Sequence, residues 1–83
     1  MQNNIGCLLS KRAEITPHNE AFVEWERQRR FTFRELNRRA NRVANALTQR
    51  GIGRGDRVAT LLRNGIEFIE TYYAIAKIGA VMV

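Results

Sequence analysis

The chain of 83 residues contains one cysteine, one proline and no long run of hydrophobic residues. Cys7 has no second cysteine to pair with, so nothing in the composition indicates an oxidising compartment. No apolar run approaches the roughly 20 residues that span a bilayer. The first residues also lack the basic start of a signal peptide. We therefore expect a cytoplasmic protein, with peripheral attachment at a membrane left open.

Acidic residues are scarce compared with basic ones. Eight Asp and Glu stand against 14 Lys and Arg, which gives a formal net charge of +6, and nearly all of the basic residues are arginine. Such an excess is compatible with a nucleic acid, an anionic membrane or an acidic partner, and it selects none of them.

No combination of residues able to carry out a reaction is recognisable. His18 stands alone in a predicted loop, and Cys7 is interpreted as a small core residue of the first helix. The glycines of GIGRGD (51–56) follow a helix and precede a strand, whereas a phosphate loop follows a strand and precedes a helix. We therefore predict no catalytic, cofactor-binding or metal-binding residue among these 83 residues.

The first half of the chain is predicted to form a short helix, a hairpin and a long helix. Ile5, Leu8 and Leu9 have helical spacing within residues 4–14. Aromatic and β-branched residues then predict strands at 21–25 and 29–33, joined by a polar turn. Thr32 and Glu35 match a capping box, so the second strand should lead directly into a helix. That helix should end near Arg50, before Gly51.

The second half is predicted to form a βαβ unit, which makes the expected fold class α/β. RVATLL (57–62) has the composition of a buried strand. Asn64 and Glu67 match a second capping box, and the helix that follows should stop at Gly79. The apolar segment 80–83 then supplies a strand parallel to the first one.

The long helix is strongly amphipathic. At about 100° per residue its apolar side chains gather on one side, and they are Leu36, Ala40, Val43, Ala44 and Leu47. Arg34 and Arg38 fall on the opposite side, and Arg39 and Arg42 flank the apolar stripe. A solvated outer face explains this pattern most simply. A nucleic-acid face and a face attracted to anionic lipid are the alternatives.

The last strand has no later residues to cover it. A buried parallel strand needs neighbours and a layer on each face, and none follows the segment 80–83. We therefore expect a piece of a larger domain. We also expect a strand edge that offers pairing to a second copy of the chain.

Several segments together resemble the N-terminal edge of the ATP-dependent, AMP-forming acyl-CoA synthetases, which belong to the adenylate-forming superfamily. The resemblance is carried by FTFREL (31–36), ANRVANAL (40–47), GIGRGDRVATLL (51–62), NGIEFIETYYA (64–74) and AKIGAVMV (76–83). The lead-in at 4–24 is also similar to the usual first helix and strand, so the resemblance covers nearly the whole chain.

The resemblance implies a function for the whole enzyme and a supporting role for this part of it. Family members use ATP and Mg to convert a fatty or related carboxylic acid to an acyl-adenylate, and coenzyme A then forms the thioester. The family's phosphate loop, metal ligand and catalytic lysine would all lie beyond residue 83. Residues 1–83 would then be the N-terminal part of the large N-terminal domain, inactive alone and partnered by the rest of the synthetase.

Overall fold

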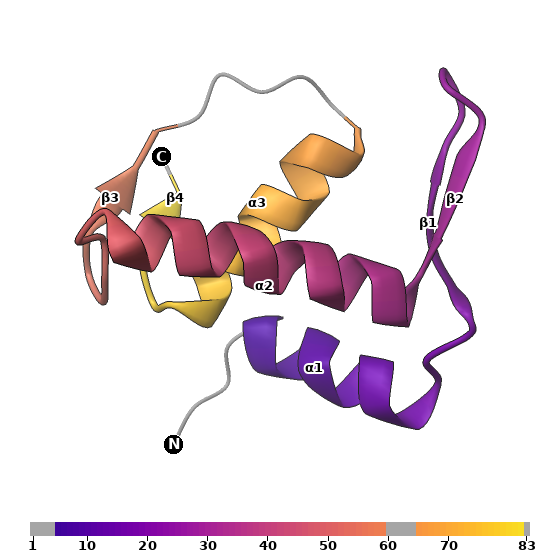
Figure 1. The fold of residues 1–83 in the computed structure, drawn as a ribbon, viewed down its shortest axis with the longest axis horizontal. Helices are drawn as coiled ribbons and strands as arrows, with labels where there is room; N and C mark the ends of the chain where they lie inside the picture. The colour runs from indigo at the N-terminus through magenta and orange to yellow at the C-terminus, as the bar shows by residue number, and fades with distance from the viewer. Residues whose placement is uncertain (1–4, 60–64, 83) are drawn as a thin grey trace.

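The computed structural model describes residues 5–59 and 65–82. Its elements are, in chain order, α1 (Ile5–Ile15), β1 (Glu20–Glu24), β2 (Arg29–Thr32), α2 (Phe33–Gln49), β3 (Arg57–Val58), α3 (Ile66–Lys77) and β4 (Val81–Met82). Figure 1 shows α2 running through the middle of the molecule, with the β1–β2 hairpin at its start and the β3–β4 pair near its end. Helix α2 packs against both α1 and α3. The predicted α/β class and order of elements are confirmed.

The hairpin is antiparallel and ends in a turn at residues 25–28. Glu24 pairs with Arg29 in the last register position, and the turn is closed by the Gln28 amide, which donates to the Trp25 carbonyl at 3.2 Å. Trp25 is therefore a turn residue, 78% exposed, and its predicted place in the first strand is wrong. Its aromatic side chain suited a strand, but the turn already begins at this residue.

Helix α2 begins and ends as the sequence predicts. The Thr32 hydroxyl accepts from the Glu35 amide at 3.2 Å, and the Thr32 amide donates to Glu35 Oε1 at 2.9 Å, so the capping box is confirmed. At the other end Gly51 has a φ of 85°. The Ile52 amide reaches back to the Leu47 carbonyl at 3.1 Å, which is the Schellman pattern of a glycine-stopped helix.

The end of α3 repeats this arrangement and leads into the parallel strand pair. Gly79 has a φ of 78°, and the Ala80 amide donates to the Ile75 carbonyl at 3.1 Å. Strand β4 then pairs parallel with β3, with Val58 opposite Met82. The predicted parallel pair is confirmed, although β3 is assigned only over Arg57–Val58 and residues 60–62 of the predicted strand lie outside the described residues. Val81 is 51% exposed.

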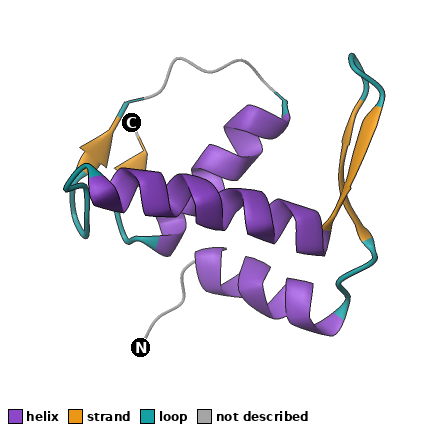
Figure 2. Cartoon of the chain, in the orientation of Figure 1, coloured by secondary structure: helices purple, strands orange, loops and turns teal. Residues whose placement is uncertain are grey.

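The core forms where the three described helices and the hairpin meet (Figure 2). It consists of Leu9, Phe31, Leu36, Ala40 and Ile66, with Tyr73 among the partly buried residues packed against it. Among the predicted stripe residues of α2, Leu36, Ala40 and Ala44 are buried, while Val43 and Leu47 are half-buried.

Helix α1 differs from the prediction in which side it buries. It contributes Leu9 to the core, whereas Cys7 is exposed and Leu8 is 64% exposed. Successive residues of a helix are about 100° apart, so Cys7 points about 200° away from Leu9. The interpretation of Cys7 as a core residue is therefore wrong. Among the described residues, no helix is both long enough and apolar enough to cross a membrane.

Candidate functional site

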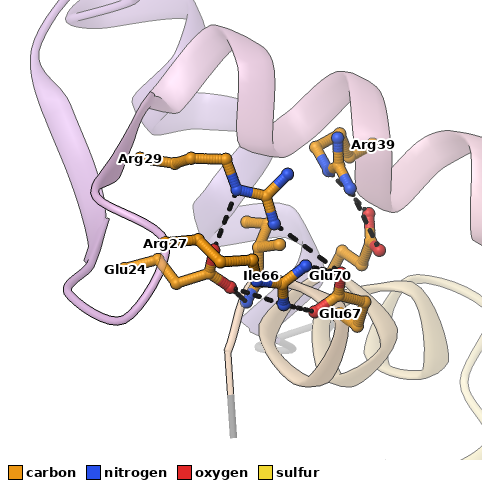
Figure 3. Close-up of polar contacts among 7 residues, drawn as sticks. All are labelled: Glu24, Arg27, Arg29, Arg39, Ile66, Glu67 and Glu70. Atoms are coloured by element: carbon orange, nitrogen blue, oxygen red, sulfur yellow. Dashed lines mark hydrogen bonds and ion pairs between the residues drawn. The ribbon is translucent and has the colours of Figure 1, made fainter.

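A cluster of oppositely charged side chains connects the hairpin, α2 and the start of α3. We call it the ion-pair junction. Its charged members are Glu24, Arg27, Arg29, Arg39, Glu67 and Glu70, and the backbone amide of Ile66 also contributes (Figure 3). Glu24 is its most buried charged member, at 5% exposure. A buried carboxylate needs charged or hydrogen-bonding partners to offset its lost hydration.

Glu24 has three such partners. Arg29 Nε donates to Oε1 at 2.9 Å, and Arg27 Nη2 donates to Oε2 at 3.0 Å. The Ile66 amide, 42 residues away in the sequence, donates to Oε2 at 3.1 Å. The hydrogen bond from Arg29 is the main reason that the pKa of the Glu24 carboxyl lies below its ordinary value.

The first backbone amide of α3, that of Ile66, therefore donates its hydrogen bond to the hairpin and not to a capping side chain of its own helix. The N-cap is Gly65, which makes no side-chain cap, so α3 begins one residue later than the predicted Asn64–Glu67 capping box would place it; Asn64 itself lies outside the described residues. Gly65 has a φ of 151°, and a Cβ there would lie 2.8 Å from Glu24 Oε2. Glycine thus permits both the backbone conformation and the approach of the carboxylate.

Glu67 faces back toward the hairpin. Arg27 Nη2 donates to its Oε1 at 2.8 Å and Arg27 Nη1 to its Oε2 at 3.2 Å, a two-point guanidinium–carboxylate pair. The hydrogen bond from Arg27 lowers the pKa of the Glu67 carboxyl. Arg29 Nη2 is buried and makes no hydrogen bond within the described chain. It lies 3.7 Å from Glu67 Oε2, which is an ion-pair distance.

Arg39 extends the junction to α2. Its Nε donates to Glu70 Oε1 on α3 at 2.8 Å, and its guanidinium carbon lies 5.3 Å from the Phe31 ring centroid. Arg29 lies over the same ring at 5.4 Å. Phe31 is therefore buried beneath two guanidinium groups that are each anchored by a carboxylate. The sequence placed Arg39 beside the apolar side chains of α2. In the structure it joins α2 to α3 through Glu70.

A second polar contact joins α1, α2 and α3. Lys77 Nζ donates to Ser10 Oγ at 2.6 Å and to Asn37 Oδ1 at 2.8 Å. Burial lowers the pKa of Lys77. The amine borders an open hollow of about 440 Å³, lined by Cys7, Ser10, Lys11, Glu14, Asn41 and Lys77. Through these two hydrogen bonds, Lys77 holds α3 against α1 and α2.

The other candidates from the sequence occupy structural positions. The Gly53 amide donates to Asp56 Oδ2 at 2.7 Å, and the Gly55 amide donates to the Gly79 carbonyl at 2.9 Å. The first of these amides is bonded within the loop and the second to Gly79 in the turn that follows α3, so neither is left to form a phosphate cradle. His18 is exposed in the connection after α1. Within residues 5–59 and 65–82, no group of three or more His, Cys, Asp and Glu could hold a metal ion.

The ion-pair junction was not foreseen from the sequence. One part of it had a signal, because Glu24 and Arg29 bracket the predicted turn and oppositely charged residues often pair across a hairpin. The partners on α3 had none, because they lie about forty residues further along the chain. The chemistry of the cluster is mutual neutralisation, which fixes elements relative to one another.

Comparison with known proteins identifies the family. The family model described as AMP-binding enzyme matches residues 9–83. The chain belongs to the AMP-binding enzymes. The long-chain-fatty-acid–CoA ligase FadD13 of Mycobacterium tuberculosis is 46% identical over 80 residues, which is 96% of this chain and 16% of FadD13. The crotonobetaine/carnitine–CoA ligase of Salmonella paratyphi B is 49% identical over 55 residues, which is 66% of this chain and 11% of that ligase.

Solved structures agree with the sequence relatives. The inhibitor-bound N-terminal domain of FACL13 from Mycobacterium tuberculosis superposes with a TM-score of 0.91 at 44% identity. The match covers 98% of this chain and 20% of that domain. This AMP-binding enzyme chain thus spans about a sixth of the length of FadD13 and has the fold of the N-terminal part of acyl-CoA synthetases. Neither of these two ligases nor this solved structure is described as binding a nucleic acid. The comparisons therefore do not support the alternative function of nucleic-acid binding.

Proposed function

We propose that residues 1–83 form the N-terminal scaffold of the large N-terminal domain of an AMP-forming acyl-CoA synthetase. One observation carries the proposal: nearly the whole chain aligns with FadD13 at 46% identity, yet it spans only 16% of that enzyme. The segment is short and is matched over nearly its whole length. Several of its charged residues hold its helices and hairpin together. Both features fit a supporting role.

The reaction of the whole enzyme would be carried out by other residues. A carboxylic acid and Mg-ATP would give an acyl-adenylate and pyrophosphate, and the thiol of coenzyme A would then displace AMP. Such chemistry needs groups that stabilise the developing charge and a metal that neutralises the phosphates. The described carboxylates with the clearest partners, Glu24, Glu67 and Glu70, are occupied by arginines. The scaffold would therefore contribute rigidity and would be inactive alone.

A domain exchange tests this role directly. The matching 80-residue segment of FadD13 would be replaced by this chain, and thioester formation with a long-chain fatty acid would be measured. We expect a soluble chimera that retains the reaction. Leu36→Asp in the chimera should abolish soluble enzyme, because it places a charge in the core, whereas Asn45→Asp on the exposed side of the same helix should not.

A second measurement tests whether the chain acts alone. The 83-residue chain would be assayed for ATP–pyrophosphate exchange with a panel of carboxylic acids, and no acid-dependent exchange is expected. Exchange by the chain itself, or a well-folded chimera without activity, would contradict the scaffold role.

The setting and further partners follow from the same proposal. The main partner is the remainder of the synthetase, in the cytoplasm. The exposed Val81 on β4 favours, as a weaker candidate, pairing of two copies along this strand edge, which light scattering would detect. Peripheral membrane contact rests on the net charge of +6 alone, and flotation with anionic vesicles at low and high salt would test it.

A further inference from the structure

A row of arginines runs along the side of α2 that faces away from the core. Arg34, Arg38 and Arg42 are all exposed and follow one another at intervals of four residues. This spacing places them on one side of the helix, about 6 Å apart along its axis. We call these residues the cationic stripe.

No ion pair within the described part of the chain neutralises the stripe. The ion pairs found among residues 5–59 and 65–82 use Arg27, Arg29, Arg30 and Arg39, and none uses a stripe residue. Glu35 is the acid nearest to the stripe in sequence. Its Oε1 accepts from both the amide and the hydroxyl of Thr32, at 2.9 and 3.3 Å. Like charges four residues apart destabilise a helix, so the fold gains nothing from this arrangement.

A hollow lies beside the stripe. It measures about 170 Å³ and is lined by Phe31, Glu35, Arg38, Arg39 and Arg42. Arg39 is held in place by Glu70 and by its position over Phe31. The stripe therefore borders a small depression in which two guanidinium groups, Arg38 and Arg42, have no carboxylate of their own within the described chain.

We propose that the cationic stripe and its hollow bind an acidic helix of a partner protein. An α-helix with carboxylates at intervals of four residues presents negative charges with the same 6 Å repeat, roughly, as the stripe. Arginine forms two-point hydrogen bonds with carboxylates, which gives such a contact orientation as well as charge. This proposal goes beyond the scaffold role and does not depend on it.

Other anionic partners fit the surface less well. The exposed neighbours of the stripe on α2 include Asn41 and Asn45, so no large apolar side chain of this face would anchor it in a lipid surface. Binding of single-stranded nucleic acid uses exposed aromatic side chains, whereas Phe31 beside the stripe is buried. A second copy of the chain would carry the same net charge of +6.

The experiment uses the full chain and two labelled helical peptides. One peptide carries three glutamates at intervals of four residues, and the other has the same composition with the glutamates distributed around the helix. Fluorescence anisotropy at low salt should show tighter binding of the first peptide, and added salt should weaken it. Equal affinity for both peptides would overturn the proposal, as would tighter binding to DNA or to anionic vesicles.

Matched variants locate the binding surface. The triple variant Arg34→Gln, Arg38→Gln, Arg42→Gln should bind the first peptide about 30-fold more weakly, at about threefold for each lost exposed pair. The control Arg50→Gln, Arg54→Gln, Arg57→Gln removes the same charge from other exposed positions. It should have a much smaller effect. Circular dichroism would establish that both variants are folded, and an equal loss in both would also overturn the proposal.

Discussion

Two groups of arginines lie within a short distance of each other and behave differently. In the ion-pair junction, Arg27, Arg29 and Arg39 each contact a carboxylate, and Arg29 and Arg39 also cover Phe31. On the cationic stripe of α2, the arginines extend into solvent without such partners in the described chain. Adjacent residues of one helix, Arg38 and Arg39, belong to different groups.

The difference arises from what packs against each side of α2. Helix α3 lies against α2 and brings Glu70 to Arg39, while its first turn brings Glu67 to the hairpin. Within the described residues, no carboxylate forms an ion pair with the stripe. An arginine in this protein therefore stabilises the fold only where another element supplies its carboxylate, and the same residue type is otherwise available for a partner.

The largest loss of stability is expected from Gly65→Ala, which would disrupt the ion-pair junction where Gly65 approaches Glu24. The new Cβ would lie 2.8 Å from Glu24 Oε2 on a backbone with a φ of 151°. Holding such a conformation without glycine costs about 1–3 kcal/mol. Urea denaturation should show a decrease of this size in the free energy of unfolding.

Gly53→Ala is the matched control for this substitution. A Cβ at Gly53 meets nothing within 4 Å, and glycine-to-alanine changes at compatible positions stabilise by about 0.4–1 kcal/mol. If both variants lost stability equally, Gly65 would have no special relation to Glu24.

A somewhat smaller effect, and a dependence on pH, is expected from Glu24→Gln. Because the folded protein lowers the pKa of Glu24, its carboxylate stabilises the fold at pH values above its ordinary, unfolded pKa. This stabilisation is lost as the pH falls through the lower folded value. The variant should therefore be less stable than the original chain at neutral pH, and the two should converge in acid.

The measurement is the free energy of unfolding in urea at a series of pH values. Glu26→Gln removes one charge from an exposed position in the turn that follows Glu24 and serves as the control. A difference between Glu24→Gln and the original chain that stayed constant down to strongly acid pH would show that the charge of Glu24 contributes nothing.

Local signals in the sequence predicted the order of the elements and several of their ends. The Thr32–Glu35 box and the glycines after α2 and α3 act through hydrogen bonds that span only a few residues. Two segments rich in aromatic and β-branched residues predicted the hairpin. Trp25 nevertheless lies in the turn, because strand propensity does not show where pairing stops.

Features that depend on distant contacts could not be predicted in the same way. Asn64 and Glu67 have the right spacing for a capping box, yet the Ile66 amide is satisfied by Glu24 from the hairpin. Cys7 was placed in the core by its residue type, although the direction that α1 buries is set by its packing on α2 and α3. Helical spacing placed Arg34 and Arg38 opposite the apolar side chains, but it grouped Arg42 with Arg39. Only the packing of α3, which brings Glu70 to Arg39, separates these two residues.

A moderate effect is expected from Arg39→Gln. The substitution removes the ion pair with Glu70 and the contact over Phe31, which together are worth about 1 kcal/mol. A double-mutant cycle with Glu70→Gln, measured by urea denaturation, should give a coupling free energy of about 0.5 kcal/mol or more. Additive effects of the two changes would show that the pair does not hold α2 and α3 together.

The smallest effect on stability is expected from Arg38→Gln, and it sharpens the comparison most directly. Arg38 is adjacent to Arg39, but it is exposed and contributes to none of the ion pairs found in the described chain. Its replacement should change the free energy of unfolding by no more than about 0.5 kcal/mol. Removing one of several like charges on the same face could even stabilise α2 slightly. The same denaturation experiment as for Arg39→Gln provides the measurement. A loss as large as that of Arg39→Gln would mean that the stripe supports the fold, and the distinction between the two groups of arginines would disappear.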